Sequence, residues 1–244
     1  MQELFLNPDN FKYINLYSSY PIIDEFVQLK LCKTVIDNNL GAITVPDSQV
    51  ENVWKWLDLS NKQLNAVINN FDGKLSVGDV FRKIKSVFNC GANLVEVVLP
   101  PFFFDIDIEN IPSCVDEYLS AINEAKGIRN VKVSLESSFI KNSYDLKGIV
   151  YLLSKYKIDF VKTASGLYTS SSTLPHLNAI LEEAKSANVK VDFLFDENLS
   201  DTFVIDDAVR LAQSIFGEEN LKQDDFYISC DIDKFLKSLG KSTC

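Results

Sequence analysis

A lysine at the end of an apolar run is the first candidate for chemistry in this chain. Lys162 follows Ile158-Asp-Phe-Val161, a run typical of a short buried strand, and it precedes the small polar turn Thr163-Ala-Ser-Gly166. Burial disfavours the charged form of an amine, so a lysine in this position can attack a carbonyl carbon. The structural alternative is a lysine that extends from the strand end into solvent.

A carboxylate within another apolar run is the second candidate. Glu96 lies between two valines, and the alternation of side chains along a strand places it on the face opposite to theirs. A carboxylate inside a barrel is costly unless it pairs with a cation or moves a proton. Lys132, near the start of a later apolar run, can pair with Glu96 in a structural salt bridge, or with Glu136 if that strand is regular. Both alternatives remain open at this stage.

The elements that must position these residues alternate along the chain. Eight short apolar runs separated by amphipathic segments predict a single-domain (β/α)8 TIM barrel over residues 1–244, an α/β fold. An open doubly wound sheet is the rival, but no glycine-rich phosphate motif follows the first run. Strands are expected at 11–15, 40–45, 63–69, 94–99, 131–135, 158–162, 190–195 and 225–229. Helices are expected at 21–38, 76–88, 111–126, 144–156, 173–187, 201–216 and 232–239. One more helix is expected to begin after an N-cap at Asp47.

The amino-acid composition indicates the cellular compartment and argues against some classes of binding partner. The 244 residues are 46% hydrophobic and carry a net charge of −10, which argues against nucleic acid or an anionic membrane as a partner. No apolar stretch is long enough to span a membrane, and the N-terminus does not resemble a signal peptide. Five scattered cysteines without C-x-x-C spacing fit a reducing compartment, so the cytoplasm is expected. A metal or other cofactor is not expected.

Four segments resemble one enzyme family. Val161-Lys-Thr-Ala-Ser-Gly166 resembles the (I/V)-K-T-S-T-G segment of the deoxyribose-phosphate aldolases, which are class I aldolases. Gly91–Pro100, Val131–Glu136 and Asn65–Phe71 are similar to three other strand segments of that family, in the same order along the chain. The resemblance covers most of the sequence and implies the same barrel fold.

The resemblance also implies an activity and a site. Lys162 would form a Schiff base with a small aldehyde or sugar, and Glu96 would move the proton at the α-carbon through water, without any cofactor. The family's carboxylate is an aspartate, so Glu96 is longer by one methylene. Family members are often dimers, which makes a homodimer an expectation. Residues implied to bind substrate are Asn15, Lys132, Thr163, Ser165, Gly166, Leu194 and Ser229.

Several positions depart from the family pattern. Leu194 stands where the family has a second lysine, which helps to keep the Schiff-base lysine neutral. The phosphate-binding glycines are missing, and four carboxylates are expected near the phosphate site: Asp192, Asp196, Glu197 and Asp231. We therefore expect a divergent aldolase with a degraded phosphate site. The alternative is a catalytically inactive barrel that acts as a binding or regulatory protein.

Overall fold

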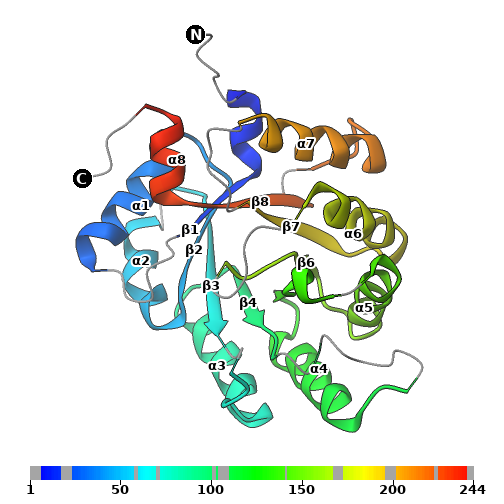
Figure 1. Ribbon diagram of the computed structural model, residues 1–244. Helices are drawn as coiled ribbons and strands as arrows, with labels where there is room; N and C mark the ends of the chain where they lie inside the picture. Colours follow the sequence, from blue (N-terminus) through cyan, green and yellow to red (C-terminus); the bar gives the residue numbers. More distant parts are fainter. Residues whose placement is uncertain are drawn as a thin grey trace.

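A closed barrel of eight parallel strands forms the centre of the protein. The computed structural model describes residues 7–17, 24–57, 60–69, 72–100, 103, 110–140, 142–166, 173–195, 202–222 and 225–240. Each strand pairs with its sequence neighbours, and β8 closes the barrel on β1. Figure 1 shows the strands surrounded by helices. The structure confirms the predicted (β/α)8 barrel and excludes the open sheet.

The strands are short and the helices that connect them are longer. The strands are Ile14–Tyr17 (β1), Ala42–Pro46 (β2), Gln63–Asn69 (β3), Leu94–Val98 (β4), Asn130–Ser134 (β5), Phe160–Lys162 (β6), Lys190–Phe195 (β7) and Phe226–Asp231 (β8). The α-helices are Glu25–Asp37 (α1), Val50–Leu57 (α2), Val77–Asn89 (α3), Ser113–Lys126 (α4), Ser143–Lys155 (α5), Leu174–Ala187 (α6), Thr202–Phe216 (α7) and Ile232–Ser238 (α8). Short 3-10 helices occupy Pro8–Tyr13 (η1), Asp47–Gln49 (η2) and Ser137–Phe139 (η4).

Local sequence signals fix several helix starts. Asp24 and Asn142 cap α1 and α5 by accepting hydrogen bonds from backbone N–H groups of the first turn. Ser76 and Asp79 form a reciprocal capping box at the start of α3. These caps satisfy N–H groups that have no partner within the helix.

Several expected boundaries were wrong by two or more residues, and two of them share one cause. The first strand begins at Ile14 rather than at residue 11, because Asn7 caps a 3-10 helix with Pro8 in its first turn. Asp47 is not a helix N-cap, because its carboxylate forms an ion pair with Lys83 while α2 begins only at Val50. In both places a short 3-10 helix precedes the regular element, which periodicity does not reveal.

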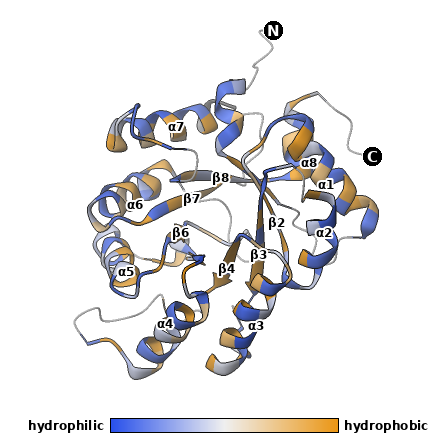
Figure 2. Cartoon of the chain, turned by 180° about the vertical axis from the view of Figure 1, so that it is seen from behind, coloured by the Kyte–Doolittle hydropathy of each residue, from blue (hydrophilic) through white to orange (hydrophobic). Residues whose placement is uncertain are grey.

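The main hydrophobic core lies between the barrel and its helices. Outward-facing strand residues such as Val95, Val97 and Val133 are fully buried beneath the helices. In Figure 2 the helices are striped orange and blue, as expected for elements that bury one face. None of the helices in the described ranges is both long enough and apolar enough to cross a membrane.

Candidate active site

The inside of the barrel is filled by side chains in layers, each contributed by alternate strands. The lowest layer is apolar and consists of Ala42, Leu94, Phe160 and Tyr227. Strand register and side-chain alternation place two polar layers above it. The first comprises Asn15, Asn65, Lys132 and Asp192; the second comprises Thr44, Glu96, Lys162 and Ser229. All eight residues are buried, whereas branched aliphatic residues usually fill such layers.

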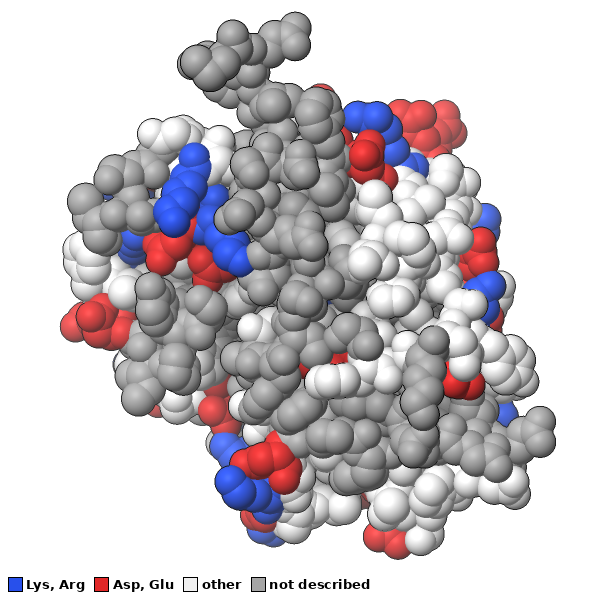
Figure 3. Space-filling model, viewed as in Figure 1, with Lys and Arg blue, Asp and Glu red and all other residues white. Residues whose placement is uncertain are grey.

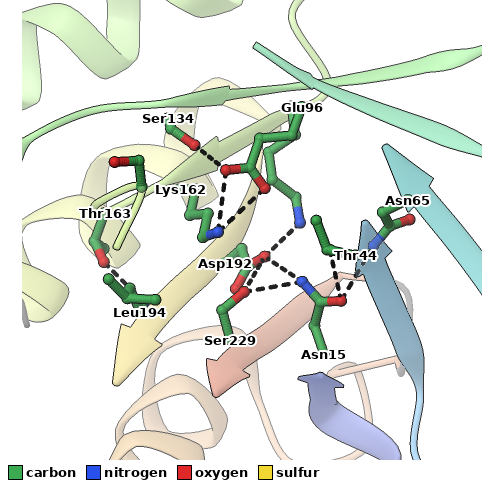
Figure 4. Close-up of polar contacts among 12 residues, drawn as sticks. Asn15, Thr44, Asn65, Glu96, Ser134, Lys162, Thr163, Asp192, Leu194 and Ser229 are labelled. Carbon is green, nitrogen blue, oxygen red and sulfur yellow. Dashed lines mark hydrogen bonds and ion pairs between the residues drawn. The ribbon is translucent and has the colours of Figure 1, made fainter. Parts of the chain in front are cut away.

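Lys162 and Glu96 form an ion pair inside the second polar layer. The Lys162 Nζ lies 3.0 Å from Glu96 Oε1 and 3.1 Å from Oε2, and the two residues are 2% and 1% exposed. Ser134 donates a hydrogen bond to the same carboxylate. Figure 4 shows both side chains directed into the barrel interior from β6 and β4. The alternation argument thus predicted the direction of Glu96 correctly.

The first polar layer contains a second ion pair, between Lys132 and Asp192. Ser229 Oγ and Asn15 Nδ2 also donate to Asp192 Oδ2, at 2.9 and 3.2 Å. Burial alone would raise the pKa of Asp192, but the positive charges of Lys132 and Lys162 and the hydrogen bonds from Lys132 and Ser229 hold it below its usual value. The salt bridge between Glu96 and Lys132, one of the alternatives that the sequence left open, is therefore not formed.

Glu136 is not the partner of Lys132 either. Its carboxylate accepts hydrogen bonds from the backbone N–H of Ser165, at 3.0 Å, and from the Ser165 hydroxyl. This contact ties the turn after β6 to the end of β5. Ser165, predicted to bind substrate, is 6% exposed and has its hydroxyl engaged with Glu136.

Asn15 links the two polar layers. Its Nδ2 donates to Ser229 Oγ at 2.9 Å, besides Asp192, and its Oδ1 accepts from Thr44 Oγ1 at 2.9 Å and from Asn65 Nδ2 at 3.4 Å. Asn15 and Ser229 therefore lie in the same network as the buried charges. Whether either residue contacts a substrate stays a prediction.

The turn after Lys162 is held against β7 and β1. Thr163 Oγ1 accepts a hydrogen bond from the Leu194 backbone N–H at 3.0 Å, and both residues are fully buried. Gly166 has a φ of +80°, and a methyl group placed on it would lie 3.0 Å from Tyr17 Oη and 3.4 Å from Leu194 Cδ2. Glycine is required here for its backbone conformation and for this close approach.

The expected cluster of four carboxylates at the barrel mouth is wrong for Asp192. That residue lies inside the barrel, one layer below Lys162. Asp231 Oδ1 accepts hydrogen bonds from the N–H groups of Asp233 and Lys234 and so caps α8. Asp196 and Glu197 fall outside the described residues.

Where Figure 3 shows charged side chains, those of opposite sign often lie side by side.

Sequence reasoning missed several residues of this site. Tyr17 places its ring centroid 5.4 Å from the Lys162 Nζ, and Asp192 anchors Lys132. Side chains two positions apart on a strand point to the same face, and this alternation could have revealed both residues. Tyr17 lies two residues after Asn15, and Asp192 lies two residues before Leu194. Thr44, Asn65 and Ser134 could have been found in the same way. Within the described part of the chain, no three His, Cys, Asp or Glu side chains are grouped to hold a metal ion.

Fold and site together define a (β/α)8-barrel protein with a lysine and a glutamate paired inside the barrel. Solved structures with a similar fold include deoxyribose-phosphate aldolases. A Toxoplasma gondii ME49 protein assigned as such an aldolase has a TM-score of 0.81 at 12% identity, over 96% of this chain and 93% of its own. The deoxyribose phosphate aldolase of Aeropyrum pernix has a TM-score of 0.72 at 19% identity, over 91% and 87%.

More distant barrels also match. Dihydrodipicolinate synthase from Oceanobacillus iheyensis has a TM-score of 0.58 at 13% identity, over 94% of this chain and 71% of its own. No protein-family model and no curated protein matches the sequence. At these identities the likeness shows a shared fold, and the activity must be argued from the side chains.

Proposed function

We propose that this protein is a class I aldolase that joins or cleaves small aldehydes through a Schiff base on Lys162. The observation that carries the proposal is the contact of the Lys162 Nζ with both carboxylate oxygens of Glu96 inside the barrel. A nucleophilic lysine needs a group that can take its proton, and here a carboxylate is in direct hydrogen-bond contact. The fold shared with deoxyribose-phosphate aldolases agrees with this reaction class.

Glu96 allows Schiff-base formation without a net change of charge. It takes a proton from the Lys162 ammonium, and the neutral amine adds to the carbonyl carbon. A proton then passes from the nitrogen to the oxygen, which becomes a hydroxyl. Glu96 then returns its proton to that hydroxyl, water leaves, and a protonated imine remains next to the carboxylate. The site begins and ends this sequence with one cation and one anion, which avoids an unpaired charge in a buried place.

The same carboxylate serves the carbon–carbon step. The imine draws electrons from the α-carbon, Glu96 accepts the α-proton, and an enamine forms. The enamine carbon then attacks a second aldehyde, whose oxygen takes the proton back from Glu96, and the imine is re-formed. Water then hydrolyses the imine and releases the product from Lys162; cleavage runs in reverse. Lys132 stays paired with Asp192 in the layer below the reacting amine. Thr163, Ser165, Gly166 and Leu194 shape the turn and strand end beside that amine.

Borohydride trapping tests this function. Incubation with acetaldehyde, reduction and peptide mass spectrometry should place the added mass on Lys162 ahead of every other lysine. Lys132 is the matched internal control, because it is also buried and paired with a carboxylate but lies one layer deeper in the barrel, and it should remain unlabelled. A Lys162→Met variant should lose the adduct and any retro-aldol turnover on free or phosphorylated sugars.

The binding or regulatory alternative makes the opposite prediction. If the Lys162–Glu96 pair only stabilises the barrel, Lys162 should be labelled no faster than surface lysines. The wild type and Lys162→Met should then be equally inactive on every sugar, and the aldolase proposal would be wrong.

A further inference from the structure

A hollow of about 670 Å³ lies between η1, α7 and the end of α1. We call it the N-terminal hollow, because η1 leads directly into β1 and the hollow therefore lies near the start of the strands, away from Lys162 at the end of β6. Figure 1 shows the first helical turn, in dark blue, beside α7. The volume falls within the range of small-molecule sites, about 300–1,000 Å³. Its polar lining includes Asn10, Lys12, Asn38, Asn39, Arg210 and Gln213.

Two hydrogen bonds hold the walls of the N-terminal hollow together. Asn10 Nδ2 donates to Asp206 Oδ1 at 2.7 Å and joins η1 to α7. The Tyr13 hydroxyl donates to the Leu221 carbonyl oxygen at 3.3 Å and joins the end of η1 to the segment after α7. Tyr13, Val209 and Leu221 are buried and supply an apolar base. The hollow is therefore formed before any ligand enters, which lowers the entropic cost of binding.

Amide side chains are the commonest polar groups in the lining, and three of them are held by one end only. Asn10 and Asn38 each use their Nδ2, the latter to donate to the Thr34 carbonyl oxygen at 2.8 Å. Asn39 uses its Oδ1, which accepts from the Lys62 Nζ. These contacts fix the amides and leave two acceptors and one donor for a ligand. An amide set with both donors and acceptors matches hydroxyl groups, which also donate and accept.

Gln213 adds a fourth amide on α7, with both ends available. No described residue forms a hydrogen bond with its side chain, which is partly exposed and lines the N-terminal hollow. Phe11 lines the same hollow and is also partly exposed, and its ring is fixed edge-on against Phe235 at 5.7 Å. The hollow thus offers polar groups beside an apolar ring.

The charges of the lining nearly cancel. Two cations stand against three carboxylates among the described lining residues: Lys12 and Arg210 against Asp9, Asp206 and Glu218. A phosphate or a nucleotide needs a surplus of cations, which this lining does not supply. A purely apolar ligand would cover the amides and leave them without partners. A neutral ligand with many hydroxyl groups meets both conditions.

We infer that the N-terminal hollow binds a neutral sugar or polyol. Gln213 and the available amide ends of Asn10, Asn38 and Asn39 hold its hydroxyl groups, and its C–H face packs against Phe11. Such hydrogen bonds replace those that the hydroxyl groups make with water. The inference goes beyond the proposed function, because it places a non-catalytic site at the other end of the barrel.

Titration with sugars that have no free aldehyde tests this site. Methyl α-D-glucopyranoside and sucrose cannot form a Schiff base, so they report binding without chemistry at Lys162. We expect at least one of them to shift the side-chain amide signals of Gln213 and Asn39 in the NMR spectrum of the isotope-labelled protein. Inorganic phosphate should leave these signals unchanged. The Lys162→Met variant should bind the sugar as the wild type does.

A pair of matched variants separates binding from a structural role. Gln213→Leu keeps the approximate size of the side chain and removes both polar ends, so the dissociation constant, followed through the Asn39 signal, should rise by about fivefold. Asn178→Leu makes a similar change on α6, outside the hollow, and should leave the dissociation constant unchanged.

Every other result counts against the sugar site. Unchanged amide signals with both sugars, or equal binding by Gln213→Leu and the wild type, would mean that the hollow holds only solvent. A stronger response to phosphate would overturn the neutral class of ligand. Loss of sugar binding in Lys162→Met would assign the sugar to the catalytic end of the barrel. A failure of aldehyde trapping at Lys162 would leave this inference intact.

Discussion

Glu96 and Lys132 are register partners on neighbouring strands, yet each forms its ion pair with another residue. Strands in a closed barrel are tilted, so a register partner lies at a different height along the barrel axis. Lys132 is level with Asp192 and Asn15, while Glu96 is level with Lys162. The tilt thus separates the two buried charge pairs into two layers and leaves Glu96 free to serve Lys162.

Glu96→Gln should nearly abolish Schiff-base formation. The amide cannot take the Lys162 proton, so we expect the trapping rate to fall by about a hundredfold or more. Glu96→Asp is the matched control, because it keeps the charge and shortens the side chain by one methylene. It should retain part of the rate. Equal trapping rates in the Glu96→Gln variant and the wild type would show that another group accepts the proton.

Leu194→Lys should increase trapping of Lys162 at neutral pH. A second amine beside Lys162 makes two adjacent ammonium groups unfavourable, which increases the fraction of neutral amine. We expect a gain of about tenfold, measured as the initial rate with acetaldehyde. Leu194→Met is the control for altered packing and should show no gain. A slower rate in Leu194→Lys than in Leu194→Met would contradict the electrostatic argument.

Asp192→Asn should destabilise the protein at neutral pH. The change leaves the buried Lys132 ammonium unpaired, and removing one member of a buried pair costs about 3–5 kcal/mol. The double variant Lys132→Met/Asp192→Asn removes both charges and should regain much of this loss. Urea unfolding of the wild type, the single variants Asp192→Asn and Lys132→Met, and the double variant measures the coupling.

The same carboxylate should make stability depend on pH. The folded-state pKa of Asp192 lies below its usual value, so its ionisation stabilises the fold above about pH 4 and the contribution is lost as pH falls through the folded pKa. The unfolding free energy of the wild type should therefore decline more steeply below that pH than the free energy of Asp192→Asn. Parallel declines would exclude Asp192 as a source of the acid sensitivity.

Two buried cysteines should be inert in the folded protein. Burial raises the pKa of Cys32 to about 11, and burial with the nearby Asp231 charge raises the pKa of Cys230 further. Because the thiolate is the reactive form, neither should react with iodoacetamide at pH 8 until the protein unfolds. Cys114 is exposed and should be labelled quickly. Rapid labelling of Cys230 would show that β8 opens locally.

The barrel could be predicted because its signals are local and repeated. Eight apolar runs, each followed by an amphipathic segment, predict the strand and helix order without knowledge of distant contacts. Successive side chains on a strand point to opposite faces, and this rule then placed Glu96 inside the barrel. The caps at Asp24 and Ser76 are local signals too, but the only cap predicted from the sequence, Asp47, was wrong.

The partners inside the barrel could not be predicted in this way. Which carboxylate pairs with Lys132 depends on the tilt of strands that are 60 residues apart in sequence. Asp192 lies next to the missing glycines in the sequence, which predicts a place at the mouth, but it lies two residues before Leu194 on the same face of β7, inside the barrel. Tyr17 is near Lys162 only because the closed barrel brings the end of β1 near the end of β6.

The two polar layers make this barrel a poor target for stabilisation by core redesign. Thermostability engineering that fills such positions with valine, isoleucine and leucine should raise the melting temperature, because buried ion pairs are often no more stable than well-packed aliphatic residues. The same changes would remove the amine and its base. A search for hardier variants should therefore hold Lys162, Glu96, Lys132 and Asp192 fixed and vary only the helices and the apolar layer beneath them.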